Sequence, residues 1–250
     1  MDSANVTVAA FAVICAGTAL GFIVKNYLRE HHADTRTQDA VKVATGVVAS
    51  MTALVLGLLV ASAKSNFDGH AAEVRNLVVN ITLLNRSLRG YQPPLTDQRE
   101  ALAQFTRDLR DKLWDEKSTL TNEQVMSRLD QVRDKFRQLD PQSLQDKALK
   151  DRLLSLSDTI ILLADELLLQ EPVSVPIQMI IVVDAWLAIT FFAFALFAPF
   201  NLVSAIALGI GAAAVALALF MIVEMDSPFQ GFVNVSPAPM DLAIAVLSRT

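Results

Sequence analysis

The stretch VKVATGVVASMTALVLGLLVASA, residues 41–63, decides the fold class of this chain. It is dominated by apolar residues, and its one charge, Lys42, stands near its start, where a long side chain can reach the membrane interface. The stretch is longer than the roughly 18 apolar residues that a helix needs to cross a bilayer. It therefore predicts a transmembrane helix.

Three further apolar runs have the same character, at residues 6–24, 176–197 and 202–223. Positive charges follow the first run, at Lys25 and Arg29, whereas a secretory signal carries them in front. The first run is therefore predicted to be an uncleaved span. Together the four runs predict an all-α integral membrane protein with four transmembrane helices.

The composition supports this class and argues against several others. The chain has 250 residues, of which 53% are hydrophobic and 19% charged, and the net charge of −5 forms no basic patch for nucleic acid. The single cysteine, Cys15, cannot form an internal disulfide. No nucleophile, phosphate-binding or dinucleotide motif occurs, so neither an enzyme nor a cofactor is predicted.

Histidines offer the one hint of a metal site. His31 and His32 stand beside Glu30 and Asp34, but adjacent residues on a helix point about 100° apart and do not converge on one ion. We interpret them as a solvated loop at the membrane interface, and no metal site is predicted.

Most of the charged residues lie between the second and third runs, where the hydrophobic period becomes that of amphipathic helices. A stripe from Phe67 to Leu88 continues out of the second run without a breaker, which predicts one long helix across the interface. Three more helices follow, opened by capping signals at Asp97 with Glu100, Thr121 with Gln124, and Asp140 with Pro141. These helices predict an inserted antiparallel bundle outside the membrane.

The chain is therefore predicted to have four parts. Residues 1–66 form a transmembrane hairpin, residues 67–172 the extramembrane helical domain, and residues 173–224 a second hairpin. Residues 225–250 are apolar but punctuated by proline and glycine. This tail is predicted to fold back on the protein or pack at the interface, and to end in a short helix near 238–247.

The distribution of Lys and Arg predicts the orientation in the membrane. The short loop 25–42 is rich in these residues, whereas the amino-terminal tail and the turn at Pro199 have none. Short positive loops stay in the cytoplasm. Both termini and the helical domain are then extracytoplasmic, in the periplasm if the host is Gram-negative.

Three carboxylates are candidate functional or structural residues. Asp184 lies inside the third run, where an ionised carboxylate costs at least ~2.5 kcal/mol. It either faces a bundle interior, a water path or a partner, or it reaches headgroup water. Glu224 and Asp226 close the fourth run before Pro228, and they mark the water boundary, pair with basic groups or line an ion entrance.

Small residues predict where the helices touch, because helix association in lipid depends on close backbone approach. Gly17 and Gly21 form a GxxxG pattern in the first run, and Ala205, Gly209 and Ala213 repeat it in the fourth. The second run carries the longest ladder, interleaved with hydroxyl residues. Its candidate face for packing or for lining a pore consists of Thr45, Ala49, Ser50, Ala53, Gly57 and Ala61.

Long motifs carry a resemblance to a known family. The segment LREHHADTRTQDAVKVATGVVASMTALVLGLLVASAKSNFDGHAAEV, together with AWLAITFFAFALFAPFNLVSA and IVEMDSPFQGFVNVSPAPM, resembles the bacterial bestrophin-like domains of unknown function. The likeness includes an acidic–apolar–Asp-x-Pro-Phe-x-Gly signature at Glu224 to Gly231.

The resemblance implies a homo-oligomeric membrane protein of the bacterial inner membrane that forms a pathway for a small inorganic ion. Its partners are then the lipid bilayer and copies of itself. The alternative hypothesis is a non-conducting sensor or scaffold whose helical domain binds a partner.

Overall fold

The structure is a computed structural model that describes residues 3–27, 35–91, 94–169 and 177–248. Over these ranges the chain is helical and contains no strand. The histidine cluster of residues 30–34 lies outside them. The helices are α1 (Ser3–Tyr27), α2 (Thr35–Arg89), α3 (Thr96–Trp114), α4 (Asn122–Arg137), α5 (Leu144–Leu169), α6 (Ile177–Phe197), α7 (Leu202–Met225) and α8 (Ala238–Ser248).

The helices form two compact units. The membrane unit comprises Met1–Asn66 and Val173–Asp226, and the bundle unit comprises Phe67–Pro172 and Ser227–Thr250. Helix α2 has 55 residues and contributes to both units, so the predicted long helix is confirmed. At a rise of about 1.5 Å per residue it extends over roughly 80 Å, well beyond the length of one span.

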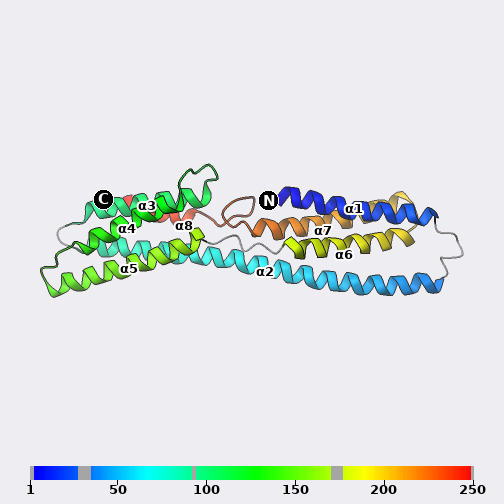
Figure 1. The fold of residues 1–250 in the computed structure, drawn as a ribbon, viewed down its shortest axis with the longest axis horizontal. Coiled ribbons are helices and arrows are strands. Elements are labelled where there is room, and N and C mark those ends of the chain that lie inside the picture. Colours follow the sequence, from blue (N-terminus) through cyan, green and yellow to red (C-terminus); the bar gives the residue numbers. More distant parts are fainter. Residues whose placement is uncertain (1–2, 28–34, 92–93, 170–176, 249–250) are drawn as a thin grey trace. The chain divides into compact units, whose positions relative to one another are not determined.

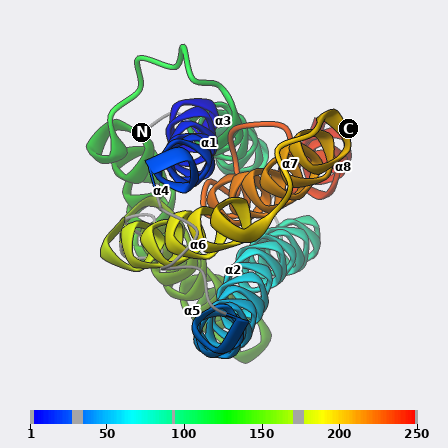
Figure 2. The same ribbon diagram turned by 90° about the vertical axis from the view of Figure 1, so that its right-hand side faces the viewer.

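The membrane unit contains the four spans. Helices α1, α6 and α7 and the first part of α2 are long and apolar enough to cross a bilayer, which confirms the four predicted spans. Helix α1 packs against both α6 and α7, and α6 lies between α1 and α2 (Figures 1 and 2). Gly17 and Gly21 of α1 face the backbone of α6, so the close contact predicted from their spacing is also present.

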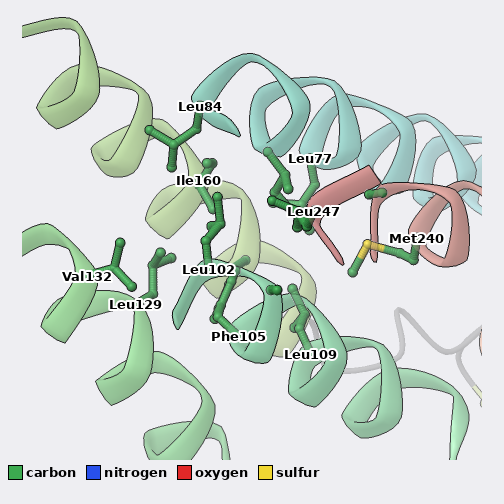
Figure 3. Packing of buried hydrophobic residues seen from close by; sticks show 14 of the residues in the cluster. Leu77, Leu84, Leu102, Phe105, Leu109, Leu129, Val132, Ile160, Met240 and Leu247 are labelled. Atoms are coloured by element: carbon green, nitrogen blue, oxygen red, sulfur yellow. The ribbon is translucent and has the colours of Figure 1, made fainter. Parts of the chain in front are cut away.

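The bundle unit has its own hydrophobic core. Helix α3 packs against α4 and α8, and α4 packs against α5. The stripe predicted on α2 is buried from Val74 to Leu88. Side chains from five helices, including Leu77, Leu102, Leu129, Ile160 and Leu247, gather in one cluster (Figure 3). Amphipathic helices that could not bury their apolar stripes singly thus bury them against one another.

The carboxy-terminal residues fold back on the bundle unit. Ser227–Thr250 belong to the bundle unit, and Met240 and Leu247 of α8 are buried in its core. The segment before α8 is also held there, because Trp114 Nε1 donates a hydrogen bond of 2.7 Å to the Val235 carbonyl. Since α3 offers an apolar face, the tail buries its own apolar residues against protein.

Candidate functional site

Helix α2 turns only part of its predicted candidate face outward. Thr45 is buried and Ala49 is half-buried, whereas Ser50, Ala53, Gly57 and Ala61 are exposed. The reason is the helical period: residues four apart are rotated by about 40°, so a ladder of five such residues turns by about 160° around the helix. The ladder therefore does not lie along one face.

The exposed part of this ladder forms a strip of small residues on the surface of the membrane unit. We call Ser50, Ala53, Gly57 and Ala61 the α2 strip. A Cβ atom on Gly57 would meet nothing within 4 Å. The Ser50 hydroxyl donates a hydrogen bond of 2.8 Å to the Gly46 carbonyl, which satisfies its proton within the helix. The strip is thus an open surface where lipid, water or another backbone can approach closely.

The opposite face of α2 contacts its own chain. Leu59 and Ala63 belong to the core of the membrane unit, and Thr45 and Thr52 are buried on the same side. The Thr52 hydroxyl donates to the Val48 carbonyl at 2.8 Å, so this buried group is satisfied as well. Thr45 was predicted to lie on the candidate face. It instead shares the buried face with residues 52 and 59, and this spacing of seven residues is the pattern that distinguishes it from the exposed small residues.

Asp184 lies on α6, among apolar residues of the membrane unit. Its side chain is half-buried, and within the described part of the chain its Oδ1 atom is buried without a hydrogen-bond partner. A buried carboxylate oxygen of this kind is costly unless water or another group satisfies it. Its neighbours on the helix, Val183 and Leu187, are buried in the core.

Glu224 and Asp226 occupy different positions at the end of α7. Glu224 is only 4% exposed, whereas Asp226 is the C-cap residue and is half-buried. The Asp226 backbone N–H bonds to the Val223 carbonyl at 3.2 Å, which closes the helix. Both residues take part in interactions within the structure. The two carboxylates, separated by one residue in the sequence, therefore do not form one open site.

At the other end of the spans, lysine side chains meet the ends of helices. Lys25 Nζ donates to the Ala198 carbonyl, just beyond α6, where the negative end of the helix dipole favours a cation. A cavity of about 260 Å³ is lined by Lys42, Thr45 and Gly46 of α2 and by Ala193, Phe194 and Phe197 of α6. Its lining is mainly apolar, as for a surface that lipid covers.

Comparisons with known proteins fit this architecture. The family model of the bestrophin-like domain matches residues 12–240. A crystal structure of a variant of a bacterial bestrophin homologue from Klebsiella pneumoniae is 15% identical, with a TM-score of 0.70 over 99% of this chain and 97% of that chain. A second structure of a homologue from this organism is 16% identical and covers 97% of this chain and 96% of that chain, with a TM-score of 0.67.

A third solved structure has the same fold. It is described as a membrane protein, is 17% identical, and covers 97% of this chain and 96% of that chain with a TM-score of 0.61. No curated protein matches the sequence. At these identities the structural likeness shows a shared fold, and the family follows from the match over residues 12–240.

Proposed function

We propose that this chain, which belongs to the bestrophin-like family, assembles with copies of itself around an ion pathway in a bacterial inner membrane. The family and the fold support a channel-like protein rather than an enzyme. A selective pathway needs polar or small groups around a water-filled space. The candidates for that lining are the α2 strip and the carboxylates Asp184 and Asp226.

One chain supplies too few spans to enclose such a space. Helices α1, α6 and α7 pack directly on one another, and the core between them is apolar, with Ile14, Val183 and Leu219 among its buried residues. A pathway must therefore lie between chains, lined by a surface that a single chain leaves open.

The α2 strip is the surface that we assign to this pathway. This assignment rests on Gly57, which is exposed and has open space around its Cα. The same helix also exposes Ser50. Small side chains leave room for a hydrated ion, and serine oxygen can replace part of its hydration shell. The same strip could instead pack against another copy, and the experiment separates the two roles.

Substitution of Gly57 by leucine tests the pathway. Gly209 on α7 is the matched control, because a Cβ there also meets nothing within 4 Å. We expect Gly57→Leu to lower ion flux into liposomes about tenfold or more and to leave the oligomer mass in detergent unchanged. Gly209→Leu should keep wild-type flux. Loss of the oligomer would assign the strip to packing, and equal flux in all three proteins would contradict its role in conduction.

The carboxylates are secondary candidates for the same pathway. We propose that Asp184 is satisfied by water or by another copy, since its Oδ1 has no partner among the described residues of its own chain. Asp226 is the candidate at the end of α7. We expect Asp226→Asn to impair assembly or flux more than Asp241→Asn, which also removes one acidic charge. Equal effects would reduce Asp226 to a marker of the water boundary.

The orientation that we propose places the loop 25–42 in the cytoplasm and the bundle unit outside. Cysteines introduced at Thr37 and Thr119, in a Cys15→Ala background, test it in intact cells. A membrane-impermeant maleimide should label Thr119→Cys and should reach Thr37→Cys only after the cells are opened. The reverse pattern would invert the topology.

A non-conducting scaffold is the second candidate function. It is favoured by large apolar side chains on the surface of the bundle unit, such as Leu162, which is 69% exposed. A purified oligomer that conducts neither cations nor anions in liposomes would favour this function over the channel.

A further inference from the structure

An apolar groove runs along the surface of the bundle unit between α2 and α8. Its volume is about 370 Å³, and its walls are Val78 and Val79 of α2 and Leu242 and Val246 of α8. Leu242 is 68% exposed, so the groove is open on one side. Arg75 is the charged residue in its lining.

A ridge of matching character lies on α5 of the same unit. Leu162 and Leu169 are each 69% exposed, and Glu166 is exposed between them. Spacings of four and three residues place these side chains on one face of the helix. The opposite face, with Ile160, is buried in the core. Helix α5 thus buries one apolar face and exposes a second one. On a surface helix of a soluble protein, this second face would be polar.

We infer that the α5 ridge of one copy binds in the α2–α8 groove of the next copy. The inference rests on the proposed assembly and names the surface of the bundle unit that makes it. The spacings agree: Leu162 to Glu166 on the ridge and Arg75 to Val79 in the groove each cover four residues, or about 6 Å of helix at a rise of 1.5 Å per residue.

The charges agree as well. Arg75 and Glu166 are exposed residues of opposite sign, one in the groove and one on the ridge. Helices α2 and α5 run in opposite directions within the unit (Figure 1). If copies are related by a symmetry axis parallel to α2 and α5, the ridge of a neighbour also runs antiparallel to α2. Leu162 of the ridge then faces Val79 of the groove, and Glu166 faces Arg75. Both matches are possible at once because Leu162 and Glu166 are four residues apart, as are Arg75 and Val79.

The groove and the ridge belong to different helices, because α2 and α8 form the groove and α5 carries the ridge. Each copy can therefore use its groove for one neighbour and its ridge for the other. Such a head-to-tail interface generates a closed ring when its rotation closes.

Disulfide cross-linking of the full-length protein tests the contact. Val79→Cys and Leu162→Cys are combined in one Cys15→Ala chain and oxidised in the membrane with copper–phenanthroline. The matched control combines Val79→Cys with Leu144→Cys, an exposed residue of α5 about 27 Å from Leu162 along the helix. We expect the first pair to give covalent dimers and a ladder of larger species, and the control pair to remain monomeric on denaturing gels.

Charge reversal provides an independent test. Arg75→Glu and Glu166→Arg should each lower the fraction of oligomer in detergent at least several-fold, with unchanged helical content by circular dichroism. The double reversal should restore it. An intact oligomer without the Val79–Leu162 cross-link would overturn this inference and leave the proposed pathway standing. A protein that is monomeric in every form would overturn both.

Discussion

A Cβ atom on Gly17 would lie 2.7 Å from the carbonyl oxygen of Ala188, which is closer than real Cβ atoms approach an oxygen. One turn further along both helices, Gly21 faces the Phe192 carbonyl in the same way. Because both contacts advance by four residues on each helix, α1 and α6 run parallel with a fixed register. Glycine at these two positions lets the backbones touch, which is how helices associate in lipid.

We expect Gly17→Ala and Gly21→Ala to destabilise the membrane unit. Each added methyl group would force the two backbones apart, and overpacking of this kind costs typically 1–3 kcal/mol. Gly46→Ala and Gly209→Ala are the controls, because a Cβ at either position meets nothing within 4 Å. Thermal unfolding in detergent should show a lower Tm for the first two variants alone. Four equal Tm values would contradict the close contact.

The sequence pattern predicted the spans more fully than it predicted their contacts. Runs of apolar residues indicate a helix in lipid regardless of its neighbours, so their existence follows from composition. The GxxxG pattern of α1 is packed, whereas Gly209 in the similar pattern of α7 is exposed and meets nothing. A helix that is apolar on all sides gives no periodic signal for its inward face. The sequence pattern therefore could not predict which helix, if any, each small residue contacts.

We expect Met240→Ala to destabilise the bundle unit by about 2–5 kcal/mol, the range for truncating a buried methionine. Met240 is fully buried where α8 packs on the core (Figure 3). Met179 of α6 is 44% exposed, and Met179→Ala is the matched control. Chemical denaturation followed by circular dichroism measures both. If the two variants behaved alike, the carboxy-terminal helix would not be part of the folded core.

The ends of the bundle helices were predicted unevenly. Thr121 and Gln124 form the predicted capping box. In contrast, α3 begins after Leu95 with no side-chain cap, and Ser143 opens α5, with its Oγ accepting from the Asp146 N–H at 3.0 Å. Loops that contain several Asp and Ser residues offer competing caps, and the packed position of the helix selects among them. The position of α8 was not predictable in the same way, because α8 packs against α3 and this contact between distant segments exists only in the assembled bundle.

Removal of the Thr121 cap should cost about 1 kcal/mol of bundle stability. Its side chain accepts a hydrogen bond of 3.1 Å from the Gln124 N–H, and Gln124 Oε1 accepts one of 2.9 Å from the Thr121 N–H. In Thr121→Ala the first of these donors loses its partner. Thr119→Ala, an exposed threonine of the same loop, should leave stability unchanged. The denaturation midpoints of the two variants are compared with that of the wild type. A lower midpoint for both variants would assign the effect to the loop rather than to the cap.

The buried tyrosine at the end of α2 should make the bundle unit sensitive to alkaline pH. Burial raises the pKa of Tyr91 above its ordinary value of 10.0, and the negative charges of Asp146 and Asp140 raise this pKa further. Well below pH 10 the phenol is neutral in the folded and the unfolded chain alike. As the pH approaches and passes 10, the unfolded chain releases this proton first, so unfolding becomes more favourable.

We therefore expect Tyr91→Phe to weaken the fall of Tm between about pH 9 and pH 11, because phenylalanine has no proton to release. Tyr27, the other tyrosine of the chain, is 85% exposed on α1, and Tyr27→Phe is the matched control. Its Tm should follow the wild-type pH dependence, since this substitution leaves the phenol of Tyr91 in place. Thermal unfolding across this pH range, followed by far-ultraviolet circular dichroism, compares the three proteins. Identical slopes for all three would show that the phenol of Tyr91 ionises as readily in the folded chain as in the unfolded one.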